Sequence, residues 1–61
     1  MVWIDVNTAL LKDKSILIFD EDGGVEFYGE DGWKKSATRE YKFDNKQSAI
    51  EIWTEVEKLI I

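Results

Sequence analysis

Apolar residues recur at three- and four-residue steps over the last eighteen positions of the chain. This spacing predicts an α-helix, because such positions lie on one helix face. The apolar positions that share this face are Ala49, Ile50, Trp53, Val56 and Ile60. Ile52 and Leu59 on one side and Ile61 on the other widen the stripe to roughly 200°, whereas a helix on one sheet needs about 100°. The sequence thus predicts a helix over 45–60 that is covered from two directions, with Asp44 as its N-cap and Gln47 at N3.

Shorter stretches of apolar residues earlier in the chain predict strands. The expected strands are residues 2–6, 9–11, 15–20, 25–29 and 33–43. Asp22-Gly23 predicts a two-residue type I′ turn, because both central residues of that turn need positive φ. A three-residue loop over 30–32 is expected in the next hairpin. The order predicts a single α+β domain: an antiparallel β-meander of four to five strands with one C-terminal α-helix packed on one face.

The expected turns also assign side chains to the two faces of the sheet. A two-residue turn sets Ile18 opposite Phe27. The face that receives Trp53 of the helix then carries Ile16, Ile18, Val25 and Phe27. The opposite face carries Leu17, Phe19 and Tyr28, which is more apolar than a solvated surface should be. The three-residue loop directs four further residues to the core, namely Trp33, Ala37, Tyr41 and Phe43.

The size of the chain favours self-association. For 61 residues, surface scaling gives roughly 6,000 Å² buried on folding. If about 60% of that area is apolar, its burial contributes about 90 kcal/mol, and ordering the chain costs about the same. No disulfide adds stability, since the chain has no Cys. The sequence therefore predicts a homodimer, and the candidate interface residues are Leu17, Phe19, Tyr28, Ile52 and Leu59.

The charge of the chain favours a basic partner. Thirteen acidic residues outweigh eight basic ones, for a net charge of −5, and this balance repels nucleic acid at long range. Either the acids only solubilise the protein, or they form a surface that inhibits a basic or nucleic-acid-binding protein. The acids of the candidate partner surface are Asp20, Glu21, Asp22, Glu26, Glu30 and Asp31.

Catalytic and metal-binding motifs are missing from the sequence. His and Cys are both absent, so no zinc or haem site and no catalytic constellation are expected. The acidic run that starts at Asp20 does not match a calcium loop, which needs Gly at its sixth position. No apolar run is long enough to span a membrane. We therefore expect a cytoplasmic, non-enzymatic interaction module without cofactor or metal.

An alternative function rests on the expected strand over 33–43, where basic residues are interleaved with aromatic ones. Such residues on a sheet hold single-stranded nucleic acid through phosphate contacts and base stacking. The residues of this alternative surface are Trp33, Lys34, Lys35, Arg39, Tyr41 and Lys42. Because the whole chain is acidic, the sequence favours the reading in which the aromatics are core residues.

Overall fold

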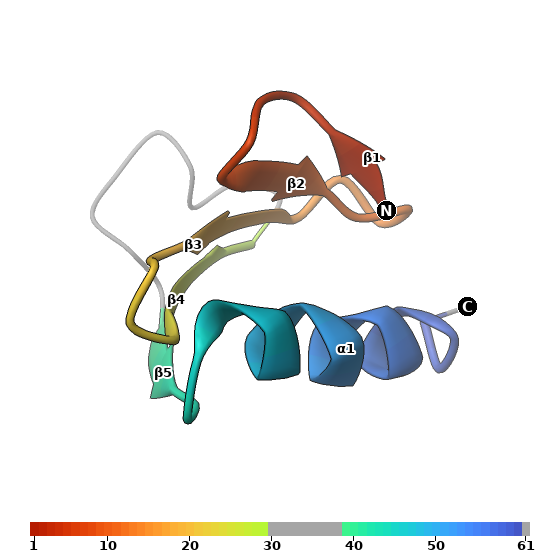
Figure 1. Ribbon diagram of the computed structural model, residues 1–61. Coiled ribbons are helices and arrows are strands. Elements are labelled where there is room, and N and C mark those ends of the chain that lie inside the picture. The colour runs from red at the N-terminus through yellow and green to blue at the C-terminus, as the bar shows by residue number, and fades with distance from the viewer. Residues whose placement is uncertain (30–38, 61) are drawn as a thin grey trace.

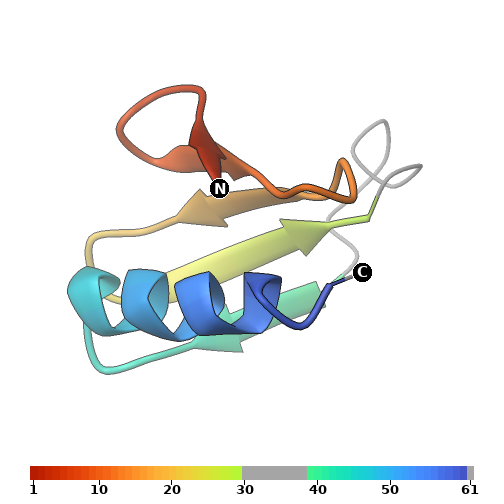
Figure 2. The ribbon, with the colours of Figure 1, turned by 90° about the vertical axis from the view of Figure 1, so that its right-hand side faces the viewer.

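The structure is a computed structural model that describes residues 1–29 and 39–60. One helix lies along one side of a five-stranded antiparallel sheet (Figures 1 and 2). The strands are β1 (Val2–Trp3), β2 (Thr8–Leu10), β3 (Ile16–Phe19), β4 (Gly24–Tyr28) and β5 (Arg39–Lys42), and the helix is α1 (Lys46–Glu57). Neighbours in the chain are neighbours in the sheet, in the order β1-β2-β3-β4-β5. The predicted α+β meander with a C-terminal helix is confirmed.

The helix begins one residue later than its predicted cap implied. Asn45, not Asp44, is the N-cap: its backbone is extended, and its side-chain Oδ1 accepts a hydrogen bond from Ser48 N–H at 2.8 Å. This bond satisfies an N–H group at N3 that has no partner within the helix. Ser48 therefore holds the position expected for Gln47, and the capping pair predicted from the sequence is wrong.

The turn between β3 and β4 differs from the prediction. Asp20 N–H donates to Gly24 O at 2.8 Å, and Gly23 N–H donates to Asp20 O at 3.1 Å. The loop thus has three residues, and only Gly23 has positive φ, at 95°. A type I turn followed by one left-handed residue needs a single glycine, whereas the predicted type I′ turn needs two positive φ angles. The two-residue turn is therefore wrong.

The extra loop residue moves every side chain of β3 to the other face, because side chains alternate along a strand. Leu17 pairs with Phe27, and Phe19 pairs with Val25. Val25 and Phe27 face the helix as predicted. Ile16 and Ile18, predicted to lie beneath the helix, lie instead on the opposite face, and Leu17 and Phe19 take their place in the core.

The second hairpin keeps the predicted faces in a different register. Val25 pairs with Tyr41. A three-residue loop over 30–32 would instead set Val25 opposite the residue four positions before Tyr41. The shift is even, so Tyr41 and Phe43 still lie on the helix side, as predicted. The predicted loop over 30–32 and the core positions Trp33 and Ala37 lie outside the described residues.

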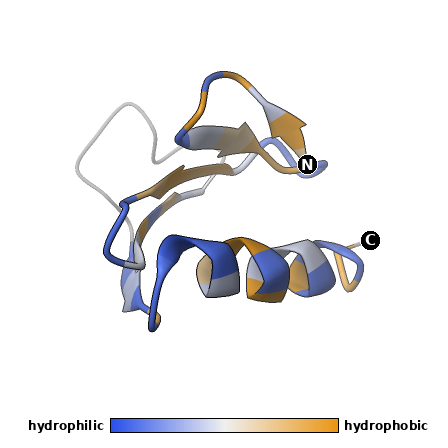
Figure 3. Cartoon of the chain, viewed as in Figure 1, coloured by the Kyte–Doolittle hydropathy of each residue, from blue (hydrophilic) through white to orange (hydrophobic). Residues whose placement is uncertain are grey.

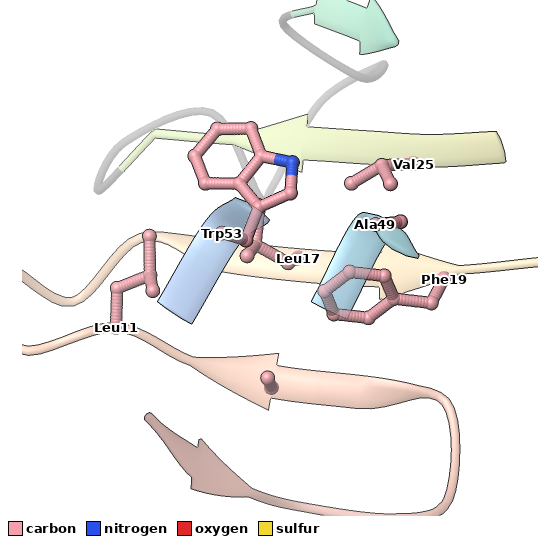
Figure 4. Packing of buried hydrophobic residues seen from close by; sticks show 7 residues of the cluster. Leu11, Leu17, Phe19, Val25, Ala49 and Trp53 are labelled. Carbon is pink, nitrogen blue, oxygen red and sulfur yellow. The ribbon is translucent and has the colours of Figure 1, made fainter. Parts of the chain in front are cut away.

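The core lies between the sheet and α1 (Figure 4). Its buried apolar residues are Ala9, Leu11, Leu17, Phe19, Val25, Ala49 and Trp53. The Trp53 ring stacks on Phe27, with ring centroids 5.8 Å apart, and meets the edge of Tyr41 at 5.4 Å. Trp53 is thus central to the core, as predicted, although its neighbours on β3 are not Ile16 and Ile18. No helix in the described part of the chain is long and apolar enough to cross a membrane.

Candidate binding surfaces

The first six residues of the chain include four exposed apolar side chains, which we together call the N-terminal patch. Its residues and their exposed fractions are Val2 (66%), Trp3 (42%), Ile4 (60%) and Val6 (79%). Much of this segment is hydrophobic in Figure 3. Its alternation predicted a strand over 2–6, but β1 ends at Trp3. The chain bends because the Asp5 carboxylate accepts a hydrogen bond from Asn7 N–H at 2.8 Å, a local bond typical of turns.

A groove of about 870 Å³ lies between the N-terminal patch and the first turns of α1. Trp3 and Val6 line one wall, and Ile50 lines the helix wall. Trp3 also packs against Phe19, with ring centroids 5.5 Å apart. The volume is in the range of small-molecule and peptide sites. The groove is therefore an apolar recess that continues the N-terminal patch.

Lys46 joins the helix to the loop that follows the patch. Its Nζ donates to Asn7 Oδ1 at 2.6 Å and to Val6 O at 3.1 Å. It also forms an ion pair with Glu21 at 3.4 Å. Since this ammonium already has three partners, it is not a free cation for a ligand in the groove.

The C-terminal end of the helix is joined to the sheet by Glu57. Its carboxylate accepts hydrogen bonds from the Met1 ammonium and, at 3.1 Å, from Lys12 N–H. The Met1 ammonium holds the pKa of Glu57 below its ordinary value, and the Lys12 N–H adds to this effect. An acid near a helix C-terminus opposes the helix dipole. These two contacts supply a physical reason for Glu57 at this position.

The sheet face opposite α1, which we call the helix-free face, carries two rows of paired side chains. The first row runs Val2, Leu10, Ile16 and Tyr28 across β1 to β4. The second row runs Thr8, Ile18, Glu26 and Glu40 across β2 to β5. Among the described elements, α1 is the only one that covers the sheet, and it covers the other face (Figure 1). The helix-free face is thus apolar on one side and acidic on the other.

An acidic hollow of about 520 Å³ adjoins the second row. The acids that line it are Asp20, Asp22, Glu26 and Glu40, and its one basic residue is Lys42. Lys42 forms an ion pair with Asp22 at 2.8 Å. The Lys42 ammonium and the Gly24 N–H hold the pKa of Asp22 below its ordinary value. No three carboxylates within the described residues gather closely enough to hold a metal ion.

The predicted acidic surface is therefore divided between two places. Asp20, Asp22 and Glu26 lie together in the hollow, joined by Glu40, which the sequence analysis did not select. Glu21 points to the groove side, where it pairs with Lys46. The remaining two predicted acids, Glu30 and Asp31, lie outside the described residues.

The predicted interface residues also separate. Leu17 and Phe19 are buried, with exposed fractions of 0% and 1%, so assigning them to an interface was wrong. The extra residue in the turn between β3 and β4 moves both side chains to the helix side of the sheet. Tyr28 is half-buried on the helix-free face. Ile52 is exposed on the helix, and Leu59 is exposed in the turn that follows it. The N-terminal patch was not proposed as an interface, although Trp3 between Val2 and Ile4 makes both faces of this segment apolar and was a signal for it.

The alternative nucleic-acid surface is described only over Arg39, Tyr41 and Lys42, since Trp33, Lys34 and Lys35 lie outside the described residues. Tyr41 packs its ring edge against Trp53 on the helix side. Lys42, the next residue along the strand, lies on the other face and pairs with Asp22. Arg39 lies on the same side as Tyr41, so the three described residues are divided between the two faces of the sheet.

No family model matches the sequence, and no curated protein or solved structure matches it either.

Proposed function

We propose that this chain is a small acidic, non-enzymatic protein-interaction module that forms a homodimer through the N-terminal patch. The observation that carries the proposal is the exposure of Val2, Ile4 and Val6, each at 60% or more, in a segment whose Trp3 and Val6 line an apolar groove. Scattered surface apolar residues are ordinary, but several exposed apolar side chains in one short segment beside a recess are typical of an interaction site. In a two-fold pair, each patch packs against the same patch of the other copy.

Charge favours the N-terminal patch over the helix-free face as the dimer interface. Each copy has a net charge of −5, so two copies repel one another at long range. The N-terminal patch contains one acid, Asp5, whose carboxylate is held by Asn7 N–H. The helix-free face would instead bring Glu26 and Glu40 of two copies together. Self-association is therefore less costly in charge repulsion at the N-terminal patch than at the helix-free face. The absence of Cys suits the reducing cytoplasm, which we propose as the site of action.

Sedimentation velocity at micromolar concentration tests the homodimer. We expect the unmodified chain to sediment as a dimer and the variant Ile4→Ser with Val6→Ser to sediment as a folded monomer. The matched control is Ile52→Ser with Leu59→Ser, which removes exposed apolar side chains from the helix and from the turn that follows it, and should leave the dimer intact. A monomeric unmodified chain overturns the homodimer. Loss of the dimer only in the helix variant would assign the interface to α1 instead.

A further inference from the structure

The helix-free face combines apolar and acidic residues in adjacent rows. Leu10, Ile16 and Tyr28 form the central part of the apolar row, and each is half-buried. The neighbouring row changes from Ile18 on β3 to Glu26 on β4 and Glu40 on β5. A ligand that lies across the strands therefore meets apolar side chains first and carboxylates next.

The two glutamates are a directly opposed pair of like charges. Glu26 on β4 pairs with Glu40 on β5, and like charges at such positions destabilise a sheet. Within the described part of the chain, neither carboxylate forms an ion pair. The contact to Glu26 is a hydrogen bond from the Tyr28 hydroxyl at 3.4 Å. Burial raises the pKa of Tyr28, and the carboxylates of Glu26 and Glu40 raise it further. Among the described residues, the fold thus keeps two repelling acids beside an apolar row, with no ion pair to offset them.

Nearby acids extend this negative charge. The hollow beside Glu26 and Glu40 is also lined by Asp20 and Asp22. Lys42 offsets one of these four acids, because it pairs with Asp22. The described residues of the hollow therefore carry an excess of negative charge next to an apolar surface, and this arrangement is complementary to a lysine or arginine side chain.

We propose that the helix-free face binds a basic amphipathic segment of a partner protein. Apolar side chains of the segment pack on Leu10, Ile16 and Tyr28, and its lysine or arginine side chains enter the hollow beside Glu26 and Glu40. A second copy of the chain does not suit this face, since it adds acids to acids. The proposal does not depend on the homodimer: none of the residues named for this contact belongs to the N-terminal patch, although Val2 of the patch is the β1 member of the same row. If the bound basic segment serves another ligand in the partner, this contact inhibits that partner.

Three synthetic helical peptides serve as probes in isothermal titration calorimetry. The first is built from leucine and lysine, the second has glutamate for each lysine, and the third has serine for each leucine. We expect the leucine–lysine peptide to bind, and the other two to bind at least about tenfold more weakly. Equal binding of the leucine–glutamate peptide would overturn the charge argument. Equal binding of the serine–lysine peptide would overturn the role of the apolar row.

Two variants of equal net charge separate this face from general acidity. Glu26→Gln with Glu40→Gln removes the opposed pair, and Glu51→Gln with Glu55→Gln removes two exposed acids from α1. We expect the first to weaken binding of the leucine–lysine peptide at least about tenfold and the second to change it little. Equal effects of the two variants would overturn the site.

The first variant should melt no lower than the unmodified chain, because a repulsion is removed. Weaker peptide binding by that variant is therefore not a consequence of unfolding. Sedimentation of the complex adds a last check. Two results together would assign the helix-free face to a second copy of the chain and overturn the proposal. The first is that the leucine–lysine peptide converts the dimer of the unmodified chain to a monomer. The second is that Ile4→Ser with Val6→Ser leaves the dimer intact.

Discussion

Leu17 and Ile18 are neighbours in the chain, yet they belong to two faces of the sheet with different properties. The face of Leu17 is covered by α1 and contains the aromatic cluster around Trp53. Lys46 near one end of the helix and Glu57 near the other join the helix to the first part of the chain. The face of Ile18 has half-buried apolar residues and two opposed glutamates. One face packs against the helix, and no described element covers the other.

This difference shows how little the apolar content of a strand says about its orientation. All four residues of β3 are apolar, so either pair could face the helix. The choice is made by the turn that follows, because one extra loop residue exchanges the two faces. The difference between the two faces therefore depends on Gly23, which permits the three-residue loop, as much as on the apolar residues of β3.

The largest effect is expected at the centre of the covered face. Trp53→Ala should cost about 3–5 kcal/mol and leave the protein barely folded, because truncating a buried Trp leaves a cavity. Glu51→Ala, on the exposed side of the same helix, should be nearly silent in thermal melts followed by circular dichroism. Equal melting temperatures for the two variants would show that α1 does not pack on the sheet through Trp53.

Trp53→Phe refines that test. The indole N–H of Trp53 is buried and has no hydrogen-bond partner among the described residues. A buried polar group without a partner costs about 1–3 kcal/mol. Phenylalanine removes this cost and keeps an aromatic ring for Phe27 and Tyr41, so Trp53→Phe should lose far less stability than Trp53→Ala. Similar losses in urea titrations would show that the volume of the indole matters more than its ring contacts.

Two adjacent alanine substitutions test the assignment of the faces directly. Leu17→Ala should lower the free energy of unfolding by about 3 kcal/mol, since Leu17 is fully buried. Ile18→Ala should lower it by about 1 kcal/mol, because Ile18 is only half-buried. Urea unfolding of the two variants measures the difference. A larger loss for Ile18→Ala would restore the orientation of β3 that the sequence predicted.

Much of the fold could be predicted from the sequence, because its signals are local and strong. The helical period around Trp53 and the strands on either side of Asp22-Gly23 are examples. The orientation of β3 could not be predicted, since Asp20-Glu21-Asp22-Gly23-Gly24 is compatible with a two-residue and a three-residue loop. The two loops turn opposite sides of β3 toward the helix. The N-terminal patch was missed because Val2, Ile4 and Val6 alternate as in a strand, while the Asp5 carboxylate bends the chain. The acidic hollow needed the register, which pairs Glu26 with Glu40.

The turn that assigns the faces should be sensitive to a single methyl group. In Gly23→Ala the new Cβ would lie 2.3 Å from Phe43 O, and the φ of 95° is unfavourable for alanine. We expect a loss of about 2 kcal/mol or more. Lys14 is the matched control: it ends the Leu11–Ser15 turn with a φ of 71°. Lys14→Gly should change stability by at most about 1 kcal/mol, in the stabilising direction. A silent Gly23→Ala would show that the loop relaxes easily.

The smallest effect is expected at Glu57, where the helix is joined to the sheet. Its pKa is lower in the folded protein than the ordinary 4.5, chiefly because the Met1 ammonium donates a hydrogen bond to the carboxylate. A lowered pKa means that protonation opposes folding. The contribution of Glu57 is therefore complete above about pH 4.5 and is lost as the pH falls through the folded pKa. Glu57→Gln should lower stability at neutral pH by about 0.5–1 kcal/mol.

Melting curves between neutral and acidic pH check this expectation. The curves for Glu57→Gln and the unmodified chain should converge as the pH falls, because both side chains are then neutral. Glu55→Gln is the control, since Glu55 pairs with Lys58 in an exposed contact on the helix surface, and such pairs contribute little. If the difference between Glu57→Gln and the unmodified chain stays constant with pH, the contact matters for its shape and not for its charge.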